Sequence, residues 1–337
     1  MNWLGLDIGG ANIKIADGNG FAMQRGFPLW KSPEKLAQTL RTLIADAPPC
    51  DHLVATMTGE LADCYENKSA GVRAILRSLH EAADGRHTRV YLTDGRLVTI
   101  PVAQRHPLLA AASNWRALAS FVGQFAPEGQ ALLMDCGSTS LDLVPLVNGV
   151  PQPKALTDTE RLLSGELIYT GVQRSPICAM VKDVPYRNRM CPIAQEVFAT
   201  MRDVYILLGD MHEDPANRNT ADGRPATKKH SRARMARMIC LDAEDFNHRD
   251  AVKAARTVAE SQLRLVAERV ASSFSDISEL PKTVIISGAG EFLLRRVLKQ
   301  IGLPAKTLSL ARRLGSTISV CAPAHAAAVL ANETSVQ

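Results

Sequence analysis

Trp3-Leu-Gly-Leu-Asp-Ile-Gly-Gly-Ala-Asn-Ile-Lys-Ile-Ala16 is the stretch that decides the fold of this chain. Its first apolar run carries Asp7, meets Gly9 and Gly10, and returns as a second apolar run that contains Lys14. Two such runs around a glycine turn predict a β-hairpin. An aspartate beside glycines is typical of a backbone that approaches a ligand closely, because glycine adds no side chain.

The same pattern returns 128 residues later. There Leu132-Leu-Met-Asp-Cys136 meets Gly137-Ser-Thr139 and continues as Leu141-Asp-Leu-Val144. The two copies align Leu4, Asp7, Gly9 and Lys14 with Leu132, Asp135, Gly137 and Asp142. An internal duplication of this kind predicts two related domains, which we place at residues 1–128 and 129–337.

Strands and helices are predicted to alternate around the two hairpins. In the first half they are expected at Glu34 to Ala45, His52 to Thr56, Ala70 to Ala83, Arg89 to Leu92 and Leu108 to Phe125. In the second half we expect a strand from Thr283 to Ser287, a helix through Gln300 and an alanine-rich helix from Pro323. This alternation favours an α/β fold with a mixed sheet covered on both faces.

A mostly helical insert is expected in the second half, at about residues 190–280. One long helix is predicted there because apolar residues recur at spacings of three and four: Val252, Ala255, Ala259, Leu263, Val266 and Val270. Asp250 is its expected N-cap. A shorter amphipathic helix is expected in the segment 224–240, where Met235, Met238 and Ile239 fall at i, i+3 and i+4.

Composition and charge exclude several classes of protein. Apolar residues make up 46% of the 337 residues, but no run of about 18 of them forms a membrane span. The seven cysteines include no Cys-x-x-Cys pair, which argues against a zinc site and favours a reducing, cytoplasmic compartment. Much of the net charge of +5 comes from the segment 224–240, which holds six Lys and Arg residues and no acid. We therefore expect neither a membrane nor a nucleic acid as partner, and a homo-oligomer stays open.

The two glycine turns are predicted to bind phosphates. Backbone N–H groups in such turns form an anion-binding concavity. The residues expected to contribute are Gly9, Gly10 and Asn12 in the first turn and Gly137, Ser138 and Thr139 in the second. A small molecule that carries successive phosphates is therefore the expected ligand.

Mg²⁺ is the expected cofactor, because it binds one or two carboxylates together with phosphate oxygens and waters. Asp7 and Asp135 are the predicted ligands, and Asp142 either assists them or faces solvent. Lys14 is expected to neutralise a phosphate, and it joins Asp7 and Asp135 among the candidate catalytic residues. The plain alternative is an ordinary hairpin with a solvated lysine.

Three stretches resemble motifs of the actin-like ATPase superfamily, and within it the hydantoinase A/oxoprolinase branch. They are Leu6-Asp-Ile-Gly-Gly-Ala-Asn12, Asp135-Cys-Gly-Ser-Thr-Ser140 and Ser287-Gly-Ala-Gly-Glu291. The first two are similar to the phosphate motifs of the superfamily and the third to its nucleoside motif. This resemblance adds Gly288, Gly290 and Glu291 to the expected cofactor-binding residues.

Three further stretches are similar to proteins of tetrahydromethanopterin-linked one-carbon metabolism. They are Met57-Thr-Gly-Glu-Leu-Ala-Asp63, Tyr169-Thr-Gly-Val-Gln-Arg-Ser-Pro176 and Thr220-Ala-Asp-Gly-Arg-Pro-Ala-Thr227. The resemblance implies two duplicated ribonuclease H-like domains, with the helical insert in the second. It also implies a Mg²⁺-dependent transferase of the methanofuran pathway, which joins a furanylmethyl diphosphate to the phenol oxygen of a tyramine-type acceptor and releases diphosphate.

A phenol acceptor must lose its proton, and two acidic residues are candidates for the base. Glu60 and Asp63 follow the predicted strand His52 to Thr56, at the carboxyl edge of the sheet where ligands of open α/β sheets bind. We favour Glu60 as a catalytic residue, although a helix-capping or solvent-facing acidic pair explains both. Arg174 suits a diphosphate or a carboxylate because its guanidinium offers two parallel hydrogen bonds, or it merely ends a strand.

The basic segment 224–240 is interpreted as a solvated face or as a lid over an anionic substrate, with an oligomer contact or a nucleic-acid patch as lesser alternatives. Arg224 is the side chain expected to reach inwards. Cys136 lies beside the second turn, but no partner that would activate a thiolate is evident. We expect a packed thiol without a catalytic role.

Three other functions stay open. Glycine loops alone do not exclude ATP as a cofactor, so an ATP-dependent small-molecule kinase is one rival. A second is an amidohydrolase like the hydantoinases and oxoprolinases, although those proteins are much longer. The third is a regulator without enzymatic activity that binds a nucleotide. The loop from Gly288 to Glu291 offers only two glycines, which leaves adenosine binding there uncertain.

Overall fold

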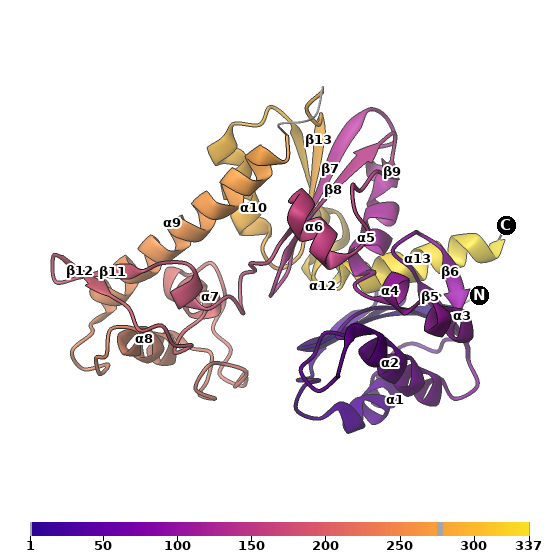
Figure 1. Ribbon diagram of the computed structural model, residues 1–337, viewed down its shortest axis with the longest axis horizontal. Coiled ribbons are helices and arrows are strands. Elements are labelled where there is room, and N and C mark those ends of the chain that lie inside the picture. The colour runs from indigo at the N-terminus through magenta and orange to yellow at the C-terminus, as the bar shows by residue number, and fades with distance from the viewer. Residues whose placement is uncertain (1, 275–278, 337) are drawn as a thin grey trace.

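The computed structural model describes residues 2–274 and 279–336, and two β-sheets form the centre of the molecule (Figure 1). The first sheet has the strand order β3-β2-β1-β4-β5-β6. Its strands are β1 (Trp3–Gly9), β2 (Asn12–Ala16), β3 (Ala22–Gly26), β4 (His52–Thr58), β5 (His87–Tyr91) and β6 (Leu97–Thr99). The predicted hairpin is confirmed, since β1 and β2 are antiparallel and Asp7 lies opposite Lys14. β4 runs parallel to β1, so both strands end at the same edge.

The second sheet repeats this arrangement with the order β10-β8-β7-β13-β14, and β9 pairs with β8. Its strands are β7 (Gln130–Cys136), β8 (Leu141–Val147), β9 (Val150–Pro151), β10 (Leu167–Ile168), β13 (Thr283–Ser287) and β14 (Lys306–Ser309). β7 is antiparallel to β8 and parallel to β13, just as β1 is to β2 and β4. Asp135 lies opposite Asp142, so the alignment of the two hairpins made from the sequence holds in the register.

Helices cover both faces of the first sheet. α1 (Leu36–Asp46) and α2 (Lys68–Ala83) bury their apolar residues against Leu4, Leu6 and Ile8 of β1. Because successive strand residues face opposite sides, Trp3 and Gly5 face the other layer. The predicted first helix begins two residues later than expected, at Leu36.

The helix predicted from Leu108 to Phe125 is wrong as a single element. α3 (Ile100–Arg105) and α4 (Pro107–Ala110) are followed by a break, and α5 (Asn114–Val122) starts anew. At the break Ala112 has a φ of 48°, a left-handed conformation that an α-helix does not accommodate. Ala112 lines the main cavity of the molecule, so the break belongs to the site described below.

Two helices between the sheets lie against the sheet from the opposite half of the chain. α5 packs against β7, β8 and β13 of the second sheet through Trp115, Leu118 and Phe121. α13 (Ala322–Val336), at the C-terminal end, packs against Trp3 and other residues of the first sheet (Figure 1). Each half of the chain thus contributes a helix that packs on the sheet of the other half. The domain boundary between residues 128 and 129 therefore stays a prediction.

Gly5 allows α13 to approach the first sheet. A Cβ atom at Gly5 would lie 2.0 Å from the backbone oxygen of Ala324, far inside van der Waals contact. Ala324, Ala327 and Ala328 of α13 are buried, so small side chains on both partners bring the helix and strand backbones together. One face of the first sheet is therefore fully packed only when α13 is in place.

The second half carries the expected helical insert, which lies beside the second sheet and away from the first (Figure 1). The helices and strands of this half that have not yet been named are α6 (Asp158–Ser164), β11 (Asp183–Tyr186), β12 (Arg189–Pro192), α7 (Met201–Leu208), α8 (Lys228–Arg237), α9 (His248–Ser272), α10 (Glu291–Ile301), α11 (Leu310–Leu314) and α12 (Ser316–Val320). Of these, α7, α8 and α9 are the helices of the insert. The residues 275–278 of the predicted insert lie outside the described part of the chain.

Two predictions about the long helix α9 are wrong. Its N-cap is Asn247, whose side chain accepts a hydrogen bond from the Asp250 backbone N–H, instead of Asp250 itself. Its buried face is also rotated, because Val258 and Gln262 are fully buried whereas Val252 and Leu263 are partly exposed. Gln262 is buried because its amide bonds to Tyr205, Thr170 and Gly171, contacts that an apolar periodicity does not reveal.

In the basic segment, Arg234 reaches inwards and Arg224 does not. Arg224 is exposed, whereas Arg234 is fully buried and forms ion pairs with Asp203 at 2.7 Å and Asp222 at 2.8 Å. Buried arginines need such partners, since an unpaired buried charge is very costly. A short helix is confirmed as α8, with Met235 buried beside Arg234, but it ends at Arg237, so Met238 and Ile239 of the predicted apolar face lie beyond it.

Candidate functional site

A cavity of about 710 Å³ lies between the two halves of the chain. It brings together twelve of the residues predicted from the sequence: Asp7, Gly9, Gly10, Asn12, Lys14, Glu60, Asp135, Gly137, Ser138, Thr139, Asp142 and Arg174. Both hairpin turns and the loop after β4 contribute to it, because parallel strand ends meet at one edge of each sheet. A cavity of this size suits a small molecule, for which pockets of roughly 300 to 1,000 Å³ are usual.

Buried charges fill the inner part of this cavity. Lys14 Nζ lies 3.6 Å from Asp7 Oδ2, and Thr56 Oγ1 donates a hydrogen bond to Asp7 Oδ1 at 3.3 Å. Burial opposes the charge of Lys14, but the carboxylates of Asp7 and Asp135 outweigh it and raise its pKa. Lys14 is therefore a fixed cation in the first hairpin, between carboxylates of both hairpins.

Asp142 and Arg161 form a second buried pair. Arg161 donates to Asp142 Oδ1 at 2.7 Å, and its guanidinium lies 4.0 Å from the centre of the Trp115 ring. Asp142 is only 7% exposed, so the alternative that it faces solvent is wrong. Burial raises the pKa of Asp142, and Arg161 opposes this shift. The role of Asp142 as a metal ligand stays a prediction, and its Oδ1 already accepts a hydrogen bond from Arg161.

Within the described residues Asp135 forms no ion pair at salt-bridge distance, although the charge of Lys14 acts on it. Burial and then the nearby carboxylate of Asp142 raise the pKa of Asp135 to about 7. Asp7, Asp135 and Asp142 bring three carboxylates to the inner cavity, whereas Lys14 and Arg161 bring two cations. The site therefore has a surplus of buried negative charge that a further cation would relieve.

A Mg²⁺ ion would compensate this negative charge, and phosphate oxygens of the bound ligand would complete its coordination shell. No group of three or more His, Cys, Asp and Glu side chains is arranged to hold a metal within residues 2–274 and 279–336. Mg²⁺ does not need such a group, since one or two carboxylates with phosphate oxygens and waters suffice. Asp7 and Asp135 are the residues that would hold it.

The two turns offer backbone N–H groups to the cavity. In the described part of the chain, the N–H groups of Gly10, Ala11, Ser138 and Thr139 form no hydrogen bond, although all four residues line the cavity. Buried or half-buried N–H groups are nearly always paired in folded proteins. Unpaired N–H groups that converge from two turns are an arrangement that binds anions.

Gly10 and Gly137 are not required by the fold, whereas a Cβ atom at Gly9 would lie only 2.7 Å from the backbone oxygen of Asn12. A Cβ atom at Gly10 would have its nearest neighbour at 3.9 Å, and one at Gly137 would have it at 3.7 Å, which are ordinary contacts. Neither residue has a positive φ. Space for a closely approaching ligand is the remaining reason for the missing side chain.

Gly137→Ala is therefore expected to leave the fold intact and to weaken binding of inorganic diphosphate. The methyl group would hold the phosphate away from the turn, and a loss of about 10 to 100-fold corresponds to one or two charged hydrogen bonds. Isothermal titration with diphosphate and Mg²⁺ measures the affinity, and thermal unfolding measures the fold. Unchanged affinity in both Gly137→Ala and Gly10→Ala would contradict an anion site at the turns.

Glu60 is buried in the cavity wall, directly after β4. The backbone of Glu60 is held against α2, because a Cβ atom at Gly71 would lie 2.2 Å from its carbonyl oxygen. The side-chain oxygen Oε2 is buried without a hydrogen-bond partner. Burial raises the pKa of Glu60 to about 7, with a further contribution from Asp158. Asp63 is exposed, so Glu60 has the environment that suits a general base near neutral pH.

The residues of the predicted nucleoside loop lie outside this cavity. A Cβ atom at Gly288 would meet the Cys136 backbone at 2.4 Å, and one at Gly290 would meet its Sγ at 2.4 Å, so both glycines serve close packing. Glu291 accepts hydrogen bonds from Ser309, Ser319 and the Ala311 backbone. Gly288 nevertheless lies beside Asp135, because a Cβ atom at Gly288 would be 2.8 Å from Asp135 Oδ1, whereas Gly290 and Glu291 do not line the cavity. Cys136 is buried, and burial raises its pKa, which disfavours a thiolate.

Several cavity residues were missed by sequence reasoning. They are Trp30, Trp115, Asp158, Arg161 and Tyr169. Asp158 at the start of α6 pairs with Lys68 at the start of α2 at 2.8 Å, which joins the two halves beside the cavity. No local pattern marks these residues, because each reaches the cavity through tertiary packing.

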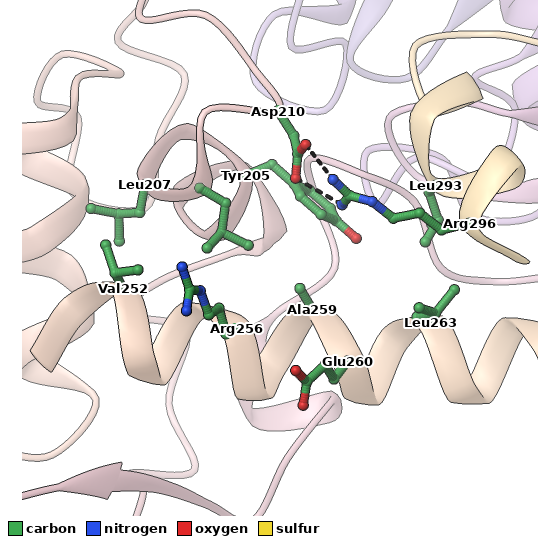
Figure 2. Close-up of a pocket in the computed structure, with 11 residues that line it drawn as sticks. Tyr205, Leu207, Asp210, Val252, Arg256, Ala259, Glu260, Leu263, Leu293 and Arg296 are labelled. Carbon is green, nitrogen blue, oxygen red and sulfur yellow. Dashed lines mark hydrogen bonds and ion pairs between the residues drawn. The ribbon is translucent and has the colours of Figure 1, made fainter. Parts of the chain in front are cut away.

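A second cavity, of about 350 Å³, lies between α7, α9 and α10 (Figure 2). Arg296 and Asp210 form two hydrogen bonds across it, at 2.6 and 2.8 Å. None of the candidate residues lines this cavity.

The model of the family described as Hydantoinase/oxoprolinase matches residues 51–333, and the chain belongs to this family. Its strand order and duplicated hairpins are those of an actin-like α/β fold. The nucleotide-free structure of an acetone carboxylase has this fold, with a TM-score of 0.53, 11% identity and coverage of 97% of this chain and 70% of that chain.

Two curated relatives carry one name, (4-{4-[2-(gamma-L-glutamylamino)ethyl]phenoxymethyl}furan-2-yl)methanamine synthase. The protein from Methanocaldococcus jannaschii is 30% identical over 332 residues, which cover 97% of this chain and 96% of that protein. The protein from Methanococcus vannielii is 28% identical over 216 residues, which cover 63% of this chain and 95% of that protein. Within the described residues, no helix is long and apolar enough to cross a membrane.

Proposed function

We propose that this chain is a transferase that joins a furanylmethyl diphosphate to the phenol oxygen of a tyramine-type acceptor and releases diphosphate. The names of the relatives describe a phenoxymethyl group on a furan, which is the linkage that this reaction forms. The observation that carries the proposal is that one cavity contains both unpaired N–H groups of two glycine turns and the buried Glu60, whose Oε2 has no hydrogen-bond partner. The first suits a leaving diphosphate and the second a proton from the acceptor.

Glu60 accepts the phenol proton in this reaction. An unperturbed phenol has a pKa near 10, whereas burial holds the pKa of Glu60 at about 7, so the carboxylate is available at neutral pH. As the O–H bond breaks, the phenol oxygen forms a bond to the methylene carbon of the donor. The carbon–oxygen bond to diphosphate breaks, and its electron pair leaves with the diphosphate. Protonated Glu60 then returns its proton to solvent.

The turns and Lys14 stabilise the leaving group. The N–H groups of Gly10, Ala11, Ser138 and Thr139 are already in place when negative charge develops on the departing oxygens, so they need no reorganisation. Lys14 adds a positive charge from the first hairpin. When bound at Asp7 and Asp135, Mg²⁺ supplies further neutralisation of this charge.

ATP-dependent functions are less well supported by the site. The loop that the resemblance assigned to a nucleoside is packed against Cys136 and lies outside the cavity. The likeness to acetone carboxylase concerns the fold alone. A kinase, an amidohydrolase and a nucleotide-binding regulator nevertheless make distinct predictions in one experiment.

The experiment incubates the protein with the furanylmethyl diphosphate, tyramine and Mg²⁺, and measures the ether product and released diphosphate. One diphosphate per ether is expected, and removal of Mg²⁺ by a chelator is expected to abolish turnover. A parallel incubation with ATP measures phosphate release. Absence of the ether from folded protein would refute the transferase, and ATP turnover or tight ATP binding instead would favour one of the alternatives.

A further inference from the structure

The mouth of the main cavity differs from its ionic interior. Trp30, Leu61 and Tyr169 line it, and the side chains of Leu61 and Tyr169 are 59% and 62% exposed. Large apolar side chains that remain exposed at the rim of a cavity mark a contact surface for a ligand. The inner part of the same cavity holds the carboxylates, Lys14 and the two turns.

The first half of the chain holds Trp30 next to the loop that carries Glu60. Leu29 packs against Gly59, since a Cβ atom there would lie 2.7 Å from Leu29 Cδ2. Cys64 Sγ also donates to the Leu29 carbonyl oxygen, at 3.7 Å. These contacts hold the segment of Trp30 against the loop that carries Leu61, and both residues line the cavity; Leu61 directly follows Glu60 in the chain. An aromatic ring bound there would have a hydroxyl within the region of Glu60.

The second half contributes Arg174 to the mouth. Its guanidinium lies 4.9 Å from the centre of the Trp30 ring, so the contact spans the cavity. Arg174 is exposed and forms no ion pair with any carboxylate in residues 2–274 and 279–336. It is therefore a positive group that is held by an indole and is free to bind a carboxylate in two parallel hydrogen bonds.

We infer that the cavity mouth is the acceptor subsite, in which Trp30 and Leu61 hold the phenol ring and Arg174 binds a carboxylate on the acceptor's tail. This inference rests on the proposed function and refines it. The phenol hydroxyl faces Glu60, the tail points to solvent, and the diphosphate of the donor occupies the turns. Arg174 is then a specificity residue for the acceptor, and its predicted alternative role as a diphosphate ligand falls away.

Steady-state kinetics with two acceptors test the role of Arg174. Wild-type protein is expected to prefer γ-glutamyltyramine, which carries a carboxylate, to tyramine, which does not. Arg174→Gln is expected to raise the KM for γ-glutamyltyramine by about 10 to 100-fold, as expected for the loss of a charged hydrogen bond. The KM for tyramine and for the diphosphate donor should change less than about twofold, within the range of a remote substitution. Arg224→Gln, at an exposed arginine outside the cavity, is the matched control.

A second pair of variants tests the ring contacts. Leu61→Asn is expected to raise the KM of both acceptors by about tenfold, because an apolar contact with the ring is lost. Leu108→Asn is the control, since Leu108 is 55% exposed and does not line the cavity. An increase in the donor KM instead of the acceptor KM in Arg174→Gln or Leu61→Asn would overturn the subsite while leaving the transferase intact.

Direct binding separates failure of the subsite from failure of the reaction. Isothermal titration with γ-glutamyltyramine, in the presence of inorganic diphosphate and Mg²⁺, needs no turnover. Binding that Arg174→Gln weakens, without product formation in the wild type, would retain the subsite and refute the transferase. No binding by folded wild-type protein would overturn the subsite.

Discussion

Glu60→Gln is expected to lower kcat by about 10² to 10⁴-fold, the range that a positioned general base contributes. The amide cannot accept the phenol proton, but it keeps the shape of the side chain in the cavity wall. Single-turnover kinetics at saturating substrates measure this step. Glu66→Gln is the matched control, because Glu66 is exposed on the same loop, does not line the cavity and should leave kcat nearly unchanged.

The same substitution is expected to stabilise the folded protein above neutral pH. Folding raises the pKa of Glu60 from 4.5 to about 7, so the folded state favours the protonated form. Relative to a permanently neutral side chain, the wild type loses stability as pH rises from about 4.5 to about 7, and the loss is complete above that range. The difference should approach about 3 kcal/mol near pH 8 and vanish below about pH 4.5, from the free energy per pKa unit.

Chemical denaturation of both proteins from pH 5 to pH 8 measures this difference. A gain in stability together with a loss of activity distinguishes a base held in an unfavourable environment from a residue that merely supports the loop. If the wild type and Glu60→Gln are equally stable at pH 5 and at pH 8, burial does not destabilise the Glu60 carboxylate. The basis for assigning Glu60 the role of base would then be lost.

Gly5→Ala is expected to destabilise the fold by roughly 4 kcal/mol or more, the range of severe steric substitutions. The added methyl group would occupy the position of the Ala324 carbonyl oxygen, and neither backbone can move without opening the packing between α13 and the first sheet. Glycine destabilises a strand relative to alanine, so the difference in strand propensity would by itself stabilise the Gly5→Ala variant. A large loss would therefore report the steric contact.

Gly26→Ala provides the control for this prediction. Gly26 ends β3 in the same sheet, and a Cβ atom there would have its nearest neighbour at 4.0 Å. Its φ is not positive, so alanine fits without strain. Thermal and urea unfolding should place Gly26→Ala close to the wild type and Gly5→Ala far below it. Similar stabilities for the two variants would contradict the close approach of α13.

Local sequence patterns predicted the hairpins well. Each consists of two apolar runs around glycines, and the register of Asp7 with Lys14 and of Asp135 with Asp142 follows from the length of the turn. Predictions failed where long-range contacts decide. Ala112 interrupts a helical pattern without any glycine or proline, and Gln262 occupies the buried face of α9 because distant hydroxyl and carbonyl groups bind it.

The candidate site shows the same division. Residues in or beside the turns could be found from the sequence, because an aspartate next to glycines is a local pattern. Arg161 and Trp30 could not, since α6 and the segment before α1 reach the cavity only through the fold. The cofactor-binding role of Gly288 and Gly290 stays a prediction, because close contact with Cys136 also explains both glycines.

The placement of α13 also affects how the protein forms during translation. At about 5 to 20 residues per second, roughly 15 to 60 seconds separate the synthesis of Gly5 from that of residue 322. Throughout this interval the layer of the first sheet that contains Trp3 is covered by α5, through Ala117, but lacks α13. Until α13 has been synthesised, the N-terminal half of the nascent chain therefore exposes an apolar surface to which chaperones can bind.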